Sequence, residues 1–170
     1  MDRSAAAQAG CPVDGDDAGD DHDPAAELYD WFFNDYVPNL AAMGRGGQPE
    51  ESILDYWGVP MHRSYGGSNE WPLQSDGVVG IVVSMHGPLR GSGYDRTSII
   101  DPAVNVYSED AAGVDVFWSR RGADETEIER IAAHFEVRLE DKGWRVISAT
   151  GTPTTADTIG GSWVRSSPDA

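Results

Sequence analysis

The chain has 170 residues, enough for one ordinary domain with an apolar core. It carries 29 Asp and Glu against 12 Lys and Arg, which gives a formal net charge of −17. This charge argues against a nucleic-acid-binding protein and against binding to an anionic membrane surface, because both need a basic face.

The acidity is accompanied by scarce lysine, since Lys142 is the only one. A halophilic host would favour such a solvated acidic surface, and a GC-rich genome would also favour Arg over Lys, so both explanations stay open. Cys11 is the single cysteine, which excludes an intrachain disulfide and a cysteine metal cluster. No signal peptide and no stretch of transmembrane length is recognisable, so we expect a cytoplasmic protein.

The two ends of the chain are predicted to be tails. Residues 1–24 contain "VDGDDAGDDHD", which is rich in acid and glycine and has little to bury, so this tail is expected to be disordered. His22 could meet a metal with its neighbouring aspartates, but such a run is ordinarily solvated, and no metal site or cofactor is predicted. Residues 153–170 are predicted to form a flexible C-terminal tail.

The first element is a helix that begins at Asp23 and Pro24, a capping carboxylate followed by proline in the first turn. Pro38 predicts a kink or break near Val37, and Gly44 is expected to end the helix. Apolar residues at three- and four-residue steps give it one buried face, namely Leu28, Trp31, Phe32, Tyr36, Leu40 and Met43.

A short second helix is expected over 49–57, a strand over 59–65 and a loop over 66–74. Ser75 or Asp76 would then cap a third helix through 77–89, although Gly80 and Pro88 leave a strand over 80–84 as an alternative. Four strands follow, over 96–108, 113–121, 127–140 and 143–151, and their short polar connectors predict an antiparallel meander. Helices followed by such a sheet indicate an α+β fold.

This order of elements resembles the nuclear transport factor 2-like (NTF2-like) superfamily, which includes SnoaL-like polyketide cyclases and ketosteroid isomerases. The resemblance covers about residues 25–152 and rests on "NDYVPNLAAMG", "ILDYWGVP" and "HFEVRLEDKGWRVIS". It implies a cone in which three N-terminal helices pack on a curved antiparallel sheet. It also implies a mostly apolar pocket inside the cone and a homodimer through the outer face of the sheet.

Ketosteroid isomerases, as members of this superfamily, use a tyrosine, a general-base aspartate and a protonated aspartate. The tyrosine of the first helix matches Tyr36. The base falls near Ser64 and the second acid at Ala133, so both carboxylates are missing. His62 would serve as the base only if a bulge or a different register turned it toward the cavity.

The stretch 131–140 of the third predicted strand of the meander separates an apolar row from a charged row, because strand side chains alternate between faces. Phe135 and Val137 belong to the apolar row and are expected to face the cavity. His134 falls in the charged row and is therefore expected on the outer face of the sheet.

Most of the aromatic residues are expected to be core, but a cone cannot fill its mouth completely. The predicted pocket suits a flat hydrophobic ligand and is lined by Phe32, Tyr56, Trp57, Ser64, Trp118, Ala133 and Phe135. The leading hypothesis is thus a binding protein for a small hydrophobic molecule. Two alternatives stay open: an isomerase or cyclase that uses His62 and Tyr36, and a structural dimerisation module without a ligand.

Overall fold

The computed structural model describes residues 23–163, and the predictions for Cys11 and His22 lie outside this range. The helical elements in chain order are α1 (Pro24–Asp30), the π-helix η1 (Trp31–Tyr36), α2 (Val37–Gly44), the 3-10 helix η2 (Glu50–Asp55), α3 (Ser75–Gly91) and α4 (Ile159–Ser162). The strands are β1 (Trp57–Tyr65), β2 (Ser68–Glu70), β3 (Tyr94–Ser108), β4 (Ala111–Gly122), β5 (Glu127–Glu140) and β6 (Gly143–Pro153). None of the described helices is both long and apolar enough to cross a membrane.

The first helix runs from residue 24 to 44 without a break but changes its winding in the middle. Pro38 has no N–H to donate to the carbonyl one turn back, and its ring would collide with that carbonyl in a regular α-helix. The chain accommodates the ring with a wider π-turn, in which the N–H of Val37 donates to the carbonyl of Phe32. The predicted disturbance near Val37 is therefore a local change of helix type, and the helix ends at Gly44 as expected.

Asp23 caps this helix, since its Oδ1 accepts hydrogen bonds from the backbone N–H groups of Ala25 at 3.0 Å and Ala26 at 3.4 Å. Asp23→Ala removes the acceptor for these two otherwise unpaired donors, so we expect it to lower the free energy of unfolding by about 1 kcal/mol. Asp23→Asn keeps an acceptor oxygen, so it should lower the free energy of unfolding by only about a few tenths of a kcal/mol. Urea denaturation of both variants checks this, and equal losses would contradict a capping role.

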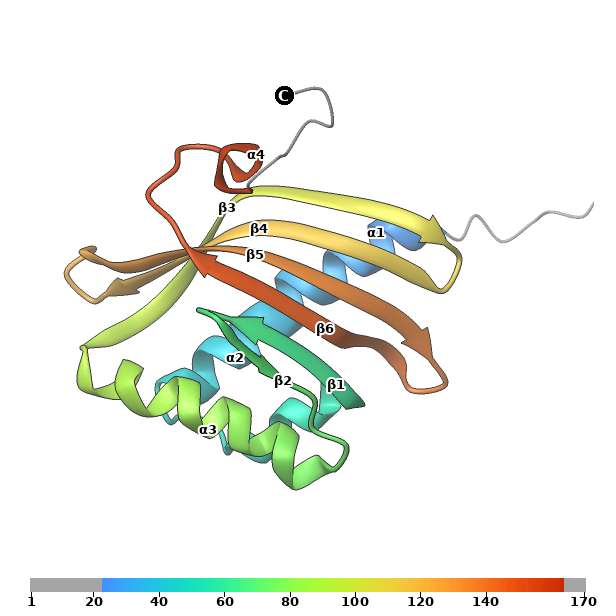
Figure 1. Cartoon of the computed structure of the whole chain (residues 1–170), viewed down its shortest axis with the longest axis horizontal. Helices are drawn as coiled ribbons and strands as arrows, with labels where there is room; N and C mark the ends of the chain where they lie inside the picture. The colour runs from blue at the N-terminus through green and yellow to red at the C-terminus, as the bar shows by residue number, and fades with distance from the viewer. Residues whose placement is uncertain (1–22, 164–170) are drawn as a thin grey trace, which may run out of the picture.

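The six strands form one sheet in the order β2-β1-β6-β5-β4-β3. Strands β3 to β6 are an antiparallel meander, as the short connectors predicted. The sheet as a whole is mixed, because β1 pairs in parallel with β6. The predicted α+β class is confirmed, with the helices of residues 24–55 and α3 on the concave face of a curved sheet (Figure 1).

Two details of the middle of the chain differ from the sequence-based prediction. The stretch 66–74 was expected to be all loop, but Ser68–Glu70 forms the edge strand β2 against β1. The third helix forms as predicted and continues through Gly80 and Pro88, but its N-cap is Gln74, not Ser75 or Asp76, and no side chain makes a capping bond there. It is helical because Val78, Val82 and their neighbours bury one face of it against the core.

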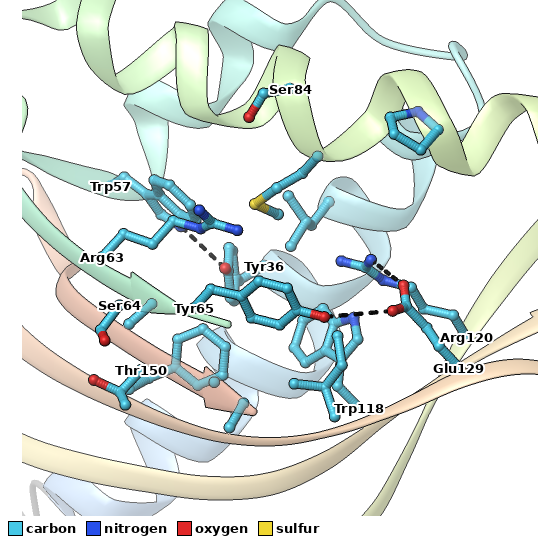
Figure 2. Close-up of a pocket in the computed structure, with 18 residues that line it drawn as sticks. Tyr36, Trp57, Arg63, Ser64, Tyr65, Ser84, Trp118, Arg120, Glu129 and Thr150 are labelled. Carbon is cyan, nitrogen blue, oxygen red and sulfur yellow. Dashed lines mark hydrogen bonds and ion pairs between the residues drawn. The ribbon is translucent and has the colours of Figure 1, made fainter. Parts of the chain in front are cut away.

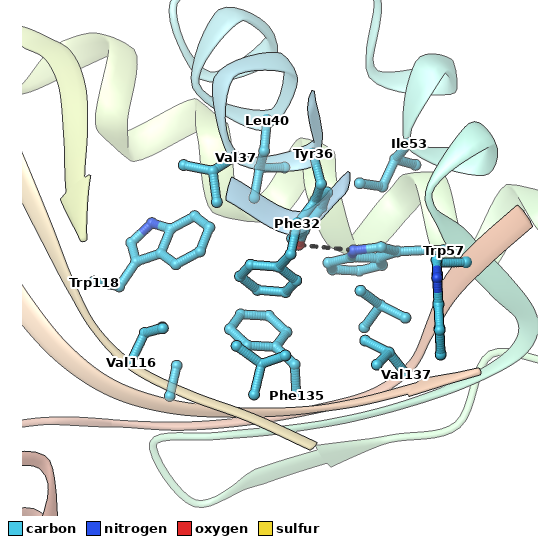
Figure 3. Close-up of a cluster of buried hydrophobic side chains, with 14 of the residues drawn as sticks. Phe32, Tyr36, Val37, Leu40, Ile53, Trp57, Val116, Trp118, Phe135 and Val137 are labelled. Carbon is cyan, nitrogen blue, oxygen red and sulfur yellow. Dashed lines mark hydrogen bonds between the residues drawn. The ribbon is translucent and has the colours of Figure 1, made fainter. Parts of the chain in front are cut away.

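The core lies between the concave face of the sheet and the first helix (Figure 3). Its centre is an aromatic stack in which the ring of Phe32 meets the ring of Tyr36 at 5.1 Å and the ring of Phe135 at 5.2 Å. Val116 and Val137 pack beneath these rings from β4 and β5. The apolar row of β5 thus faces the helices, as its alternation predicted.

The outer face of the sheet carries the charged row of β5. His134 lies there between two carboxylates, with Nδ1 2.9 Å from Asp115 and Nε2 2.9 Å from Glu136. Burial alone lowers the pKa of His134, but the hydrogen bonds to Glu136 and Asp115 outweigh it and raise the pKa above its ordinary value. His134 is therefore a partner of outer-face carboxylates and not a cavity residue.

After β6 the chain turns back over one end of this outer face, and α4 lies on the side of the sheet opposite α3 (Figure 1). Arg130 fastens the turn, because its backbone carbonyl accepts from the N–H of Thr154 and its guanidinium donates to the carbonyl of Ala156. Phe117, which shares the outer face with Asp115, is fully buried, and the Arg130 guanidinium lies over its ring, 5.8 Å from the centroid.

Candidate functional site

A cavity of about 280 Å³ opens between the concave face of the sheet and the helices (Figure 2). Its walls come from the first helix, α3 and strands β1, β4, β5 and β6. The side chains that contribute to these walls are Tyr36, Leu40, Trp57, Arg63, Ser64, Tyr65, Ser84, Met85, Pro88, Trp118, Arg120, Glu129, Ile131, Ala133, Phe135, Ala149 and Thr150. The cavity is apolar over most of its lining and polar on one side.

Tyr36 stands in the apolar wall, where η1 places it against the rings of Trp118 and Phe135. Its hydroxyl oxygen accepts a hydrogen bond from Nε1 of Trp57 at 3.0 Å. Burial raises the pKa of Tyr36, and the hydrogen bond from Trp57 and the charge of Arg120 offset only part of the increase, so the hydroxyl keeps its proton at neutral pH. Among the described residues, none accepts that proton.

The polar side of the cavity is built by two arginines and the carboxylates that pair with them (Figure 2). Nη1 of Arg120 lies 2.5 Å from Oε1 of Glu129, and the hydroxyl of Tyr65 donates to Oε2 of the same carboxylate at 3.5 Å. Nη1 of Arg63 lies 2.9 Å from Oε1 of Glu70. The guanidinium of Arg63 also lies over the ring of Tyr65, 5.1 Å from its centroid.

Six of the residues predicted for the site line this cavity, namely Tyr36, Trp57, Ser64, Trp118, Ala133 and Phe135. Phe32 lies behind the wall, fully buried in the aromatic stack. Tyr56 points away from the cavity, and its hydroxyl donates to Oδ1 of Asp35 at 2.9 Å. Partial burial, together with the hydrogen bond to Asp35, raises the pKa of Tyr56 to about 12.

His62 is absent from the cavity wall. Its Nδ1 lies 2.9 Å from Oγ of Ser148, its Nε2 lies 2.7 Å from Oδ1 of Asn69, and its ring stacks on Trp71. Its cross-strand partner Ser148 pairs in turn with Glu136, which belongs to the outer-face row. The structure therefore places the imidazole on the side of β1 opposite the cavity.

The reason lies in an irregularity of β1. The stretch from Trp57 to His62 lies opposite only Val146 to Ser148, so the strand bulges around Pro60. Such a bulge changes which residues of the strand face the cavity, so counting positions from the second helix does not predict the face correctly. After the bulge, β1 brings Arg63 and Tyr65 into the cavity wall, and Ser64 between them also lines it.

The sequence analysis missed six polar residues of the wall: Arg63, Tyr65, Ser84, Arg120, Glu129 and Thr150. A usable signal exists for two of them, because strand residues two apart share a face. Arg120 follows Trp118 by two positions in β4, and Glu129 precedes Ile131 by two in β5, so both extend rows already recognised as inward.

The side chains that meet in this cavity are suited to binding. Within residues 23–163, no histidine lines the cavity, and both oxygens of its one carboxylate, Glu129, already accept hydrogen bonds. Over the same residues there is no group of three or more His, Cys, Asp or Glu placed to hold a metal ion. What the cavity offers is an aromatic surface and two guanidinium groups.

Comparison with known proteins gives a family and a fold. A family model described as an NTF2-like protein (DUF6841) matches residues 26–154. No curated protein matches the sequence. A protein of unknown function from the DUF3225 family of Pectobacterium atrosepticum is similar in structure, with a TM-score of 0.56, 16% identity and coverage of 78% of this chain and 91% of that one.

Two further solved structures are similar at the same level. An NTF2-like protein with a cystatin-like fold from Novosphingobium aromaticivorans has a TM-score of 0.53 and 14% identity, over 84% of this chain and 95% of that one. A protein from Parabacteroides distasonis, described only provisionally as a ketosteroid isomerase, has a TM-score of 0.52 and 11% identity, over 70% of this chain and 86% of its own. At these identities the similarity shows the fold alone.

Proposed function

This chain belongs to the DUF6841 family of NTF2-like proteins, and from that premise we propose that it binds a small, flat hydrophobic molecule in the cavity between sheet and helices. The observation that carries the proposal is an open cavity of about 280 Å³ whose apolar wall is built from Tyr36, Trp57, Trp118 and Phe135. Such a volume is close to the lower end of ligand pockets, and aromatic walls with a few polar groups are their usual lining.

The two other hypotheses receive less support from this geometry. A structural module would be expected to close its cavity with side chains, whereas this one stays open. An isomerase would need a base beside Tyr36, and the ring of His62 is held at the outer face by Ser148 and Asn69. A homodimer through the outer sheet face and a cytoplasmic location stay predictions from the sequence.

The proposal is tested with N-phenyl-1-naphthylamine, a neutral aromatic dye that fluoresces in apolar surroundings. The wild-type chain should bind it at one site per chain. Ala133→Leu puts a larger side chain into the cavity wall and should weaken binding at least tenfold. Ala103→Leu makes the same change at an exposed position of β3 and should leave binding unchanged.

Fluorescence titration gives the affinities, and near-ultraviolet circular dichroism checks that each variant keeps its packed core. Equal binding by the wild type and a folded Ala133→Leu variant would show that the dye binds elsewhere. Failure of the wild-type chain to bind the dye would contradict the proposed function.

A further inference from the structure

The cavity contains two cations that an apolar ligand alone would not require. The side chains of Arg63 and Arg120 are only 14% and 11% exposed. Arginine is almost never buried to this degree unless it is paired, and removing its charge from water is costly. This chain has only 12 Lys and Arg against 29 acidic residues, yet it places two of them in the wall of one cavity.

Each arginine has a carboxylate partner, but the pairing leaves most of its donors unused. Arg63 contacts Glu70 through Nη1 alone, and Arg120 contacts Glu129 through Nη1 alone. A guanidinium carries five N–H donors. For the other nitrogens of both arginines, no acceptor occurs in the described part of the chain.

The two carboxylates are more exposed than the arginines that they neutralise, since the side chain of Glu70 is 39% exposed and that of Glu129 is 31% exposed. Water therefore screens the negative partner of each pair more than the positive one. Tyr65 also donates to Glu129, so the oxygens of that carboxylate are occupied. The hydroxyl of Ser84 is likewise engaged, because it donates to the carbonyl of Ile81.

The result is a cavity with an excess of hydrogen-bond donors. The guanidinium groups of Arg63 and Arg120 can both donate to a ligand, while both oxygens of Glu129, the one carboxylate in the described cavity wall, already have partners. A donor-rich wall on one side of an aromatic surface fits a molecule with a flat apolar body and an acceptor-only head. A carboxylate is the group that matches the planar fork of arginine in two parallel hydrogen bonds.

We propose that the ligand of this cavity is an aromatic or similarly flat organic acid, whose carboxylate is bound by Arg120 and Arg63 while its ring lies against Tyr36 and Trp118. This inference rests on the proposed function and narrows its ligand class. The net charge of the chain opposes the approach of an anion, but this repulsion is long-range and largely screened beyond about 8 Å at physiological salt. The arginine contacts act at hydrogen-bond distance inside the cavity.

The test compares two probes that differ only in the head group, 2-naphthoate and the neutral 2-naphthamide, by isothermal titration calorimetry at pH 7.5. The wild-type chain should bind the acid at least tenfold more tightly than the amide. Arg120→Gln and Arg63→Gln should each reduce this ratio to near one, mainly by weakening the acid. Arg138→Gln removes an exposed outer-face arginine and should leave the ratio unchanged.

The test uses two separate arginine variants, so it stays decisive if one of them fails to fold. An unchanged acid-to-amide ratio in folded Arg63→Gln and Arg120→Gln would overturn the anion preference. If the neutral dye N-phenyl-1-naphthylamine still binds in that case, the cavity remains a binding site and only its ligand class is wrong. If the wild type binds neither the dye nor the naphthalene probes, the proposed function itself fails.

Discussion

Phe32→Ala is expected to lower the free energy of unfolding by about 3–5 kcal/mol, the usual cost of deleting a buried phenylalanine ring. The ring of Phe32 is 0% exposed and meets the rings of Phe33, Tyr36 and Phe135 at 5.0–5.2 Å. The π-turn of η1 and the strand β5 both contribute to this contact, so neither can close the space alone. Guanidinium denaturation measures the loss as a lower midpoint with an unchanged slope.

The matched control is Tyr29→Ala in the same helix. The side chain of Tyr29 is 49% exposed, and its main ring contact is with Phe33 at 4.5 Å, so its loss should cost less than about 1 kcal/mol. If Phe32→Ala and Tyr29→Ala were equally destabilising, the aromatic stack would not be the centre of the core.

His86→Leu is expected to flatten the pH dependence of stability on the acidic side. His86 lies in α3, 2% exposed, and its Nδ1 has no hydrogen-bond partner among the described residues. Burial is the largest cause that lowers the pKa of His86 to about 4; the charges of Arg120 and Arg90 act in the same direction, and the charge of Glu50 opposes them. In the unfolded chain the same ring has its ordinary pKa near 6.5.

The sign of the effect follows from these two values. Between pH 6.5 and pH 4 the unfolded chain binds a proton that the folded chain excludes, so acid favours unfolding throughout this window. Lowering the pH from 7.5 to 5 should therefore cost the wild type about 1–2 kcal/mol more than the leucine variant. Urea denaturation at these two pH values measures the difference.

His134→Gln provides the opposite control. The carboxylates that flank His134 raise its pKa, so its contribution to stability is present below its unfolded pKa and is lost as the pH rises through the folded value. This variant should therefore lose more stability at pH 5 than at pH 7.5. Parallel pH profiles for the wild type and His86→Leu would show that the buried imidazole is not excluding a proton.

The architecture of the domain was predictable because its signals are local. The Asp23-Pro24 cap, the apolar face through Leu28 and Phe32, and the alternation of β5 each depend on neighbouring residues in the chain. Pro38 predicted a disturbance of the first helix, but the choice between a kink and a π-turn depends on how the helix packs on the sheet. The parallel pairing of β1 with β6 has no local signal.

The candidate site was only half predictable. The aromatic wall follows from periodicity, whereas the polar wall depends on which ends of β1, β4 and β5 meet across the cavity. The bulge around Pro60 decides that Arg63 faces inward and His62 outward, and it comes from the pairing of β1 with Val146 and Ser148. A pair such as Arg120 with Glu129 can be recognised only when the register of β4 against β5 is known.

The turn of the chain after β6 also limits how two copies could meet. The segment with Thr154, Ala156 and the helix α4 lies over the β3 side of the outer face, where Arg130 contacts it. On the same face, Phe117 is fully buried. A homodimer through the outer sheet face, as the sequence predicts, would meet less obstruction near the opposite margin of the sheet, beside His62 and Ser148. Two copies could pack their whole outer sheet faces against each other only if the segment after β6 moved away from the sheet.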